Sequence, residues 1–111
     1  MDRTNVLTQL MTLIEDRKSN PPSRSYTTSL FQGGVEKIGA KILEEASEVV
    51  EAAGKCDATR RHRLVHEAAD LIYHLFVLLG YREVKLIEVE AELARRFGVS
   101  GLDEKASRSD G

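Results

Sequence analysis

Two pairs of acidic residues share the same spacing. Glu45 and Glu48 are three residues apart, and so are Glu67 and Asp70. Residues three apart lie on one face of an α-helix, where like charges repel each other by about 0.2–0.5 kcal/mol. Carboxylates that converge at the edge of a core resist desolvation, and a divalent cation such as Mg²⁺ resolves this conflict. The spacing alone leaves two interpretations open, a metal site and a solvated helix surface.

Helices must position these acids, because the chain shows helical periodicity and no convincing alternating strand pattern. We expect four helices, over about residues 5–17, 35–53, 60–79 and 82–97. The prolines within residues 19–23 end the first helix, and residues 24–32 are expected to form an irregular connector or a short turn. Asp57 or Thr59 is expected to cap the third helix, and Gly80 to stop it.

Short connections make consecutive helices antiparallel neighbours. The expected fold class is therefore all-α, an antiparallel bundle of about four helices, with residues 1–111 as a single domain. The second and third helices are apolar over wide arcs, so we expect a second copy of the chain to complete the packing, as a homodimer or homotetramer. The two arcs contain Val35, Ile42, Ala46, Val49, Val50 and Ala53, and Leu64, Ala68, Leu71, Ile72, Leu75 and Leu79.

The two acidic pairs lie beside these arcs, so antiparallel pairing of the two helices would bring four carboxylates together at the seam. Lys37 and Lys41 are candidates for phosphate contact, although lysines four residues before a glutamate also form simple helix-stabilising pairs. His74 shares the stripe of the second acidic pair. The sequence leaves open whether it is a ligand, a base or a hydrogen-bonded structural residue.

Composition excludes several classes of function. With 41% hydrophobic and 31% charged residues, the chain has the composition of a globular protein. A net charge of -2, the lack of Trp and 5% aromatic residues argue against binding nucleic acid. No uninterrupted apolar run approaches the roughly 18 residues of a membrane span, and the N-terminus lacks the features of a secretory signal. Together with the single Cys56, this favours a cytoplasmic protein without a membrane partner.

Two segments closely resemble a known family. They are SYTTSLFQGGVEKIGAKILEEASEVVEAA, from Ser25, and HEAADLIYHLFVLL, from His66. They are similar to phosphoribosyl-ATP pyrophosphohydrolases, which belong to the all-α nucleotide pyrophosphohydrolases together with MazG-type enzymes and all-α dUTPases. The superfamily pattern Glu-x-x-Glu followed by Glu-x-x-Asp coincides with the two acidic pairs. The tail from Ser100 to Arg108 resembles the same family.

The resemblance implies an enzyme that binds an ATP derivative. It would hydrolyse phosphoribosyl-ATP to phosphoribosyl-AMP and pyrophosphate, the second step of L-histidine biosynthesis, with Mg²⁺ and with Mn²⁺ as a possible substitute. The implied metal ligands are Glu45, Glu48, Glu67 and Asp70. The implied catalytic residues are Glu44, Glu45 and Glu48, and the implied substrate-binding residues are Ser25, Tyr26, Thr27, Lys37 and Lys41. Glu44 is expected to be an additional ligand, a supporting group or the residue that orients the water.

Two alternatives remain. A MazG-like housekeeping pyrophosphohydrolase of (d)NTPs would use the same acids, so only the choice of substrate separates it from the first reading. A helical dimerisation module would carry the acids merely as a solvated surface. In that case Glu48→Gln and Asp70→Asn should be harmless or slightly stabilising, whereas an enzyme would lose Mg²⁺-dependent hydrolysis and keep its fold.

Overall fold

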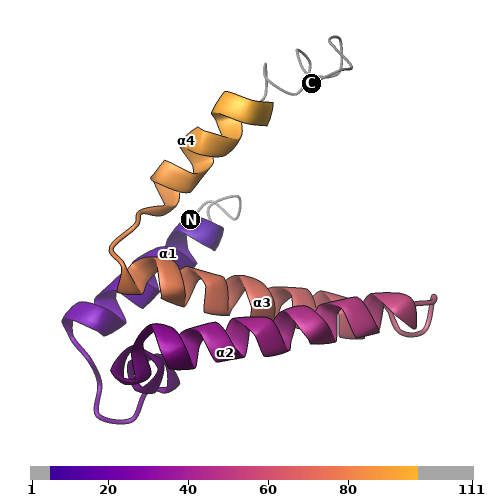
Figure 1. The fold of residues 1–111 in the computed structure, drawn as a ribbon, viewed down its shortest axis with the longest axis horizontal. Coiled ribbons are helices and arrows are strands. Elements are labelled where there is room, and N and C mark those ends of the chain that lie inside the picture. The colour runs from indigo at the N-terminus through magenta and orange to yellow at the C-terminus, as the bar shows by residue number, and fades with distance from the viewer. Residues whose placement is uncertain (1–5, 98–111) are drawn as a thin grey trace.

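The computed structural model describes residues 6–97, which form four α-helices and no strand. The helices are α1 (Val6–Ser19), α2 (Tyr26–Gly54), α3 (Arg61–Tyr81) and α4 (Leu86–Phe97). The long helices α2 and α3 run antiparallel side by side, α1 crosses the end of this pair, and α4 leads away from it (Figure 1). The all-α prediction is confirmed for the described residues. The predicted helix start at Asn5 and the tail from Ser100 lie outside them.

The hydrophobic core sits where α1 crosses α2 and α3. It consists of Met11, Ile14, Leu30, Ile38, Phe76 and Val77. Full burial of an aliphatic side chain of this size contributes about 1.5–3 kcal/mol. Further along the α2–α3 pair the buried side chains are Ala52 and the carboxylates of Glu45 and Glu67. The core thus holds one end of the helix pair together and leaves its middle to polar residues.

The second helix starts earlier than predicted. Ser25 has an extended backbone, and its hydroxyl accepts a hydrogen bond from the Thr28 N–H at 3.2 Å, so it caps a helix that begins at Tyr26. The expected irregular connector over residues 24–32 is therefore wrong for most of its length. The helix breaks at Gly34, where φ is +68° and ψ is -163°, and its long straight segment then begins at Val35 as predicted.

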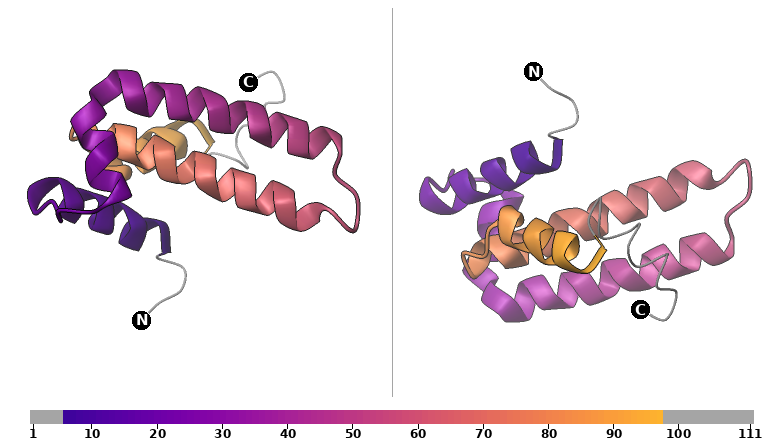
Figure 2. Two further views of the ribbon diagram at one scale, coloured as in Figure 1. Left: turned by 90° about the horizontal axis from the view of Figure 1, so that it is seen from below. Right: turned by 90° about the horizontal axis from the view of Figure 1, so that it is seen from above.

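The break at Gly34 gives α2 two segments with different directions. In Figure 2 the first turns of α2 run at a steep angle to the long segment that lies along α3. The dihedral angles of Gly34 belong to a region that is essentially restricted to glycine, because a Cβ atom would clash there. This glycine therefore determines how the first segment folds back over α3.

The predicted cap of the third helix is wrong. Arg60 occupies the N-cap position, and its side chain makes no capping hydrogen bond. The carboxylate of Asp57 instead accepts hydrogen bonds from the Thr59 N–H at 2.9 Å and the Thr59 hydroxyl at 2.7 Å. Aspartate readily makes such local bonds to residues just after it, so Asp57 stabilises the α2–α3 turn and leaves the helix end uncapped by a side chain.

The end of α3 also differs from the prediction, because the helix continues through Gly80. The Glu83 N–H bonds to the Gly80 carbonyl at 3.0 Å and the Val84 N–H to the Leu79 carbonyl at 2.9 Å. This is a Schellman motif, with Glu83 at φ +60° in the place where glycine is usual. Gly80 serves packing instead: a Cβ there would lie 3.1 Å from Cγ2 of Ile14, so glycine allows α1 and α3 to approach closely.

The fourth helix begins at Leu86 and not at Arg82 as predicted. The residues before it complete the Schellman turn of α3, and so they cannot take part in a new helix. The Lys85 N–H donates to the Glu88 carboxylate at 2.9 Å, which satisfies one of the free donors at the helix start.

The predicted apolar arcs are only partly buried. On α2, Val35 and Val50 are exposed, and Ile38 and Ala52 are buried instead. On α3, Ile72 and Leu75 are also exposed, although the sequence placed both in the arc. The helices meet through the edge of each arc, where the acidic residues lie. Nothing within residues 6–97 covers the remainder of the arcs.

By length and composition, α3 is apolar enough to cross a membrane. Core helices of globular proteins pass the same test. Glu67 and His74, both buried, lie on α3, and its Phe76 and Val77 belong to the hydrophobic core. These features are those of the central helix of a bundle.

Candidate active site

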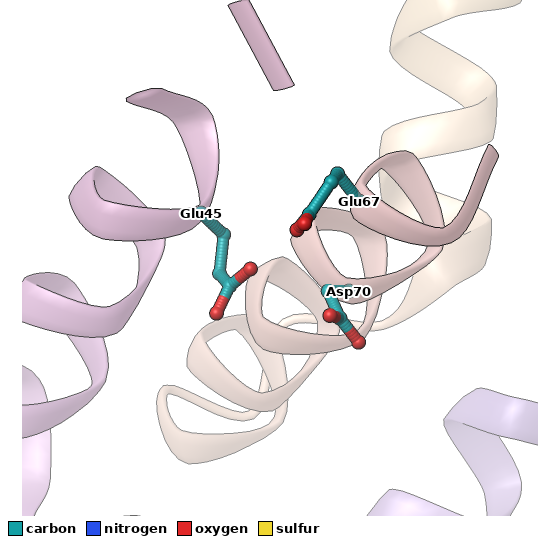
Figure 3. A group of neighbouring side chains, drawn as sticks. All are labelled: Glu45, Glu67 and Asp70. Carbon is teal, nitrogen blue, oxygen red and sulfur yellow. The ribbon is translucent and has the colours of Figure 1, made fainter. Parts of the chain in front are cut away.

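Three of the four predicted metal ligands meet between α2 and α3. Glu45 on α2 and Glu67 and Asp70 on α3 each offer a carboxylate oxygen, and these oxygens all lie within 4.8 Å of one another. Figure 3 shows the three side chains projecting into the space between the two helices. Glu45 is 6% exposed and Glu67 is 8% exposed. Buried carboxylates at this separation repel one another unless a cation lies between them.

The environment of Glu45 fits a cation. Its Oε1 atom is buried and has no hydrogen-bond partner, while Oε2 lies 3.7 Å from the ammonium group of Lys41. A buried carboxylate oxygen without a partner is costly, because it has lost its water and gained nothing in return. A divalent metal held by oxygen ligands would satisfy this atom, and the neighbouring acids supply ligands of the same kind.

The fourth predicted ligand, Glu48, lies against Glu67. The negative charge of Glu67, followed by partial burial and a hydrogen bond with Glu67, raises the pKa of the Glu48 carboxyl, and the more distant Arg63 opposes this shift. The two side chains therefore compete for too little positive charge. All four predicted carboxylates belong to one region of the α2–α3 seam.

Basic side chains flank the acids on their exposed side. Lys41 lies 3.2 Å from Glu44 as well as near Glu45, and the hydrogen bond to Glu44 raises the pKa of Lys41. On α3, Arg63 lies 3.8 Å from the Glu67 carboxylate and His66 lies 3.3 Å from the Asp70 carboxylate. Glu44 itself is exposed, one residue from the buried Glu45. Lys41 and Glu44 thus stand at the solvent side of the cluster.

The structure separates the predicted substrate-binding residues into two groups. Lys41 lies beside Glu44 and Glu45, and Tyr26 bonds through its hydroxyl to His74, which in turn bonds to the carbonyl of Asp70. Burial raises the pKa of Tyr26, and the charge of Lys41 partly opposes this. Lys37 instead donates to the Ser29 carbonyl at 3.3 Å, on the outside of the kinked segment.

The remaining two predicted residues make contacts inside the fold. The hydroxyl of Ser25 caps α2, and the hydroxyl of the buried Thr27 pairs with that of Tyr73 on α3. No sequence pattern indicated this pairing, because it joins residues 46 positions apart. The first contact stabilises the start of α2, and the second attaches this segment to α3.

His74 is buried and makes two hydrogen bonds. Its Nδ1 lies 2.8 Å from the Asp70 carbonyl oxygen, and its Nε2 lies 2.9 Å from the Tyr26 hydroxyl. Neither ring nitrogen is therefore directed at the carboxylate oxygens. Of the three roles left open by the sequence, the geometry favours that of a hydrogen-bonded structural residue.

A separate hollow of about 350 Å³ lies between α1 and the end of α3. It is lined by Lys18, Lys85, Glu15 and Glu83, among others. These charges already pair with one another, Lys18 with Glu83 and Lys85 with Glu15, each at 3.5 Å. None of the clustered acids lines this hollow, so we place the candidate active site at the α2–α3 seam.

Comparison with known proteins agrees with this seam. The family model of phosphoribosyl-ATP pyrophosphohydrolase matches residues 7–97. The chain belongs to this family. It is 54% identical over 102 residues to a phosphoribosyl-ATP pyrophosphatase of Rhodopirellula baltica, covering 92% of this chain and 85% of the relative. It is 48% identical over 107 residues to the Geobacter metallireducens protein of the same name, covering 96% and 95%.

A third relative extends the match over almost the whole chain. The phosphoribosyl-ATP pyrophosphatase of Novosphingobium aromaticivorans is 48% identical over 110 residues, which is 99% of this chain and 100% of the relative. The family resemblance noted from the sequence is thereby confirmed. In this member of the phosphoribosyl-ATP pyrophosphohydrolase family, the Glu-x-x-Glu and Glu-x-x-Asp pairs lie on α2 and α3 and face each other.

Proposed function

We propose that this protein hydrolyses phosphoribosyl-ATP to phosphoribosyl-AMP and pyrophosphate, which is a step of L-histidine biosynthesis. Water adds across the α–β phosphoanhydride, and pyrophosphate leaves. Membership of the family supports the substrate. The single structural observation that carries the chemistry is the unpartnered, buried Oε1 of Glu45 beside the carboxylates of Glu67 and Asp70.

The acids fit a divalent cation, which we propose to be Mg²⁺, with Mn²⁺ as a substitute. Glu45, Glu48, Glu67 and Asp70 would hold it, because hard cations of this size prefer carboxylate oxygens. When bound, such an ion would supply neutralisation of charge on the pyrophosphate and a lowered pKa for an attacking water. One or more ions per site are compatible with four carboxylates.

The chain's own residues mainly hold and orient the substrate. Glu45 and Glu67 are buried, so their carboxylates are fixed before the substrate arrives and need little reorganisation. Lys41 is partly exposed beside them and can exchange its contact with Glu44 for a phosphate oxygen. Glu44, released from Lys41 in this way, would be a free carboxylate beside the cluster that could orient the attacking water. Lys37 would contact phosphate only after leaving the Ser29 carbonyl.

We further propose that the protein acts as a homodimer or larger symmetric assembly. Leu43 and Val50 on α2 are 74% and 72% exposed, and Val65 on α3 is 65% exposed. These side chains lie on parts of α2 and α3 that no other described residue covers. A second copy would bury such apolar surface by the same packing that forms helical bundles.

Pyrophosphate release from phosphoribosyl-ATP, dUTP and dCTP tests the function. We expect rapid, Mg²⁺-dependent turnover of phosphoribosyl-ATP that stops on chelation. Glu67→Gln should reduce kcat/KM by at least about 100-fold, because even groups that only orient metal ligands contribute about 10–100-fold. Glu36→Gln, at an exposed position of α2, should match the wild type. Faster turnover of dUTP or dCTP would contradict the proposed substrate.

A further inference from the structure

The bonding of His74 determines which of its nitrogens carries a hydrogen. A carbonyl oxygen only accepts hydrogen bonds, so Nδ1, 2.8 Å from the Asp70 carbonyl, is the protonated nitrogen. In a neutral imidazole Nε2 is then an acceptor. The Tyr26 hydroxyl, 2.9 Å away, therefore donates to Nε2. His74 thus joins the turn of α3 that carries Asp70 to the first residue of α2.

A second contact strengthens this connection. The Tyr26 ring stacks on Tyr73, with centroids 6.2 Å apart and planes at 22°, and Tyr73 pairs with the Thr27 hydroxyl. Tyr73 and His74 follow Asp70 by about one helical turn. The first segment of α2 is therefore attached to α3 next to the carboxylates, across the break at Gly34.

The ring of Tyr26 is nevertheless accessible. The residue is 51% exposed although its hydroxyl is hydrogen-bonded, and the His74 that holds it also bonds to the carbonyl of Asp70 in the acidic cluster. An aromatic face fixed at the mouth of a phosphate site suits the flat base of a nucleotide, since bases stack on aromatic side chains. A freely rotating tyrosine would offer this face only part of the time and would bind more weakly.

We propose that His74 is a positioning residue, which holds the Tyr26 ring as the stacking surface for the base of the nucleotide substrate. The proposal rests on the proposed function for its substrate. In this proposal the four acids act on the anhydride, whereas the Tyr26 ring contributes to substrate binding. Loss of the His74–Tyr26 contact should therefore change KM and leave kcat nearly unaffected.

Steady-state kinetics with phosphoribosyl-ATP tests this with matched variants. His74→Asn keeps a donor near the Asp70 carbonyl but cannot reach Tyr26, whereas His74→Gln places an amide oxygen near the position of Nε2. We expect His74→Asn and Tyr26→Phe each to raise KM about three- to tenfold, the range for loss of one hydrogen bond, with kcat within about twofold. His74→Gln should recover most of the loss. His62→Gln, at an exposed position of α3, is the control.

The double variant Tyr26→Phe/His74→Asn should have the KM of either single variant, because both remove the same contact. Two results would overturn the positioning role. One is a double variant whose increase in KM is the product of the two single increases, and the other is a KM of His74→Gln as high as that of His74→Asn. A wild-type protein without activity on phosphoribosyl-ATP would overturn the proposed function, and the base-stacking role with it.

The wild-type protein itself offers a spectroscopic readout that depends on no variant. Nitrogen NMR of the wild-type protein at neutral pH should show His74 with its hydrogen on Nδ1 and a hydrogen-bonded Nε2. Tyr26→Phe should shift the Nε2 resonance and leave that of His62 unchanged. A hydrogen on Nε2 of His74 in the wild type would contradict the assignment and overturn the proposal.

Discussion

At the scale of single residues, the site is defined by carboxylates that outnumber the cations around them. Glu45 has a buried oxygen without a partner, and Glu48 competes with Glu67 for the same positive charge. Arg63 and Lys41 lie at 3.8 Å and 3.7 Å from the buried acids and remain partly exposed. Such an arrangement weakens the metal-free protein and favours binding of a cation, which couples folding to metal binding.

The raised pKa of Glu48 predicts how the stability of the metal-free protein changes with pH. Its folded-state pKa is raised above the ordinary value of 4.5, so the folded metal-free protein holds this proton more tightly than the unfolded chain. The stability that results is fully present below about pH 4.5 and is lost as the pH rises through the folded-state pKa. We expect thermal unfolding to show this loss without metal, and Mg²⁺ to reverse it.

Glu48→Gln removes the repulsion with Glu67. The metal-free variant should therefore unfold at a higher temperature than the wild type at pH 7, and its stability should depend less on pH. Mg²⁺-dependent hydrolysis should fall at the same time, which a purely solvated acidic surface would not predict. Glu36→Gln should change neither property. A variant that is less stable than the metal-free wild type would show that the Glu48 charge is already compensated.

At the scale of the elements, the break in α2 brings two parts of the site together. The short segment before Gly34 carries Tyr26, and the long segment after it carries Lys41 and Glu45. Both segments lie against α3, one through His74 and the other through the acidic seam. The angle at Gly34 therefore determines the distance between the aromatic group and the carboxylates.

Gly34→Ala should destabilise the protein, because a Cβ is strained at φ +68° and would lie 3.2 Å from the Tyr81 hydroxyl. We expect the free energy of unfolding to fall by about 1–3 kcal/mol, measured by denaturant titration. Gly39→Ala is the control, since a Cβ there meets nothing within 4 Å. It should raise the stability by about 0.5–1 kcal/mol. Equal effects of the two substitutions would contradict the special role of Gly34.

Glu83→Gly should have the opposite effect on the end of α3. Glu83 occupies the left-handed position of the Schellman motif with φ +60°, where glycine has no Cβ strain. We expect a gain of about 1 kcal/mol in the free energy of unfolding. The ion pair with Lys18 is lost, but Glu83 is largely exposed and such pairs contribute little. A net loss of stability would show that this ion pair outweighs the backbone strain.

The sequence predicted the elements and the acidic seam better than the helix ends. Periodicity placed four helices, and the two acidic pairs were found because residues three apart share a helix face. The predicted ends of α3 were wrong because they depend on local hydrogen bonds that composition does not reveal. The Asp57 carboxylate accepts from the Thr59 N–H, and the Glu83 N–H donates to the Gly80 carbonyl. The contact between Tyr26 and His74 depends on the fold-back at Gly34, so only the three-dimensional structure shows it.

At the scale of the whole molecule, the described part of the chain leaves much of α2 and α3 uncovered. Part of the predicted apolar arcs remains exposed in one chain, at Val50 on α2 and Leu75 on α3, as expected if a second copy completes their packing. The described part of α4 contains no buried residue and extends away from the α2–α3 pair (Figure 1). Surfaces of this kind mark sites of association.

Val50→Asp should break the proposed assembly, because the new carboxylate would be desolvated between two apolar surfaces. Light scattering at micromolar concentration should show a dimer or larger species for the wild type and monomers for the variant. Ala58→Asp adds the same charge to the exposed α2–α3 turn and should leave the assembly intact. A wild-type protein that is monomeric under these conditions would reject the assembly.

The central claim is that acids from α2 and α3 jointly bind divalent metal, and calorimetric titration with Mg²⁺ or Mn²⁺ tests it most directly. In the presence of a non-hydrolysable nucleotide analogue, the wild type should bind the metal. Glu45→Gln keeps the shape of the side chain but removes the charge, and should weaken binding by at least about tenfold. Glu36→Gln should bind like the wild type. No metal uptake by the wild type, or equal uptake by Glu45→Gln, would contradict the account.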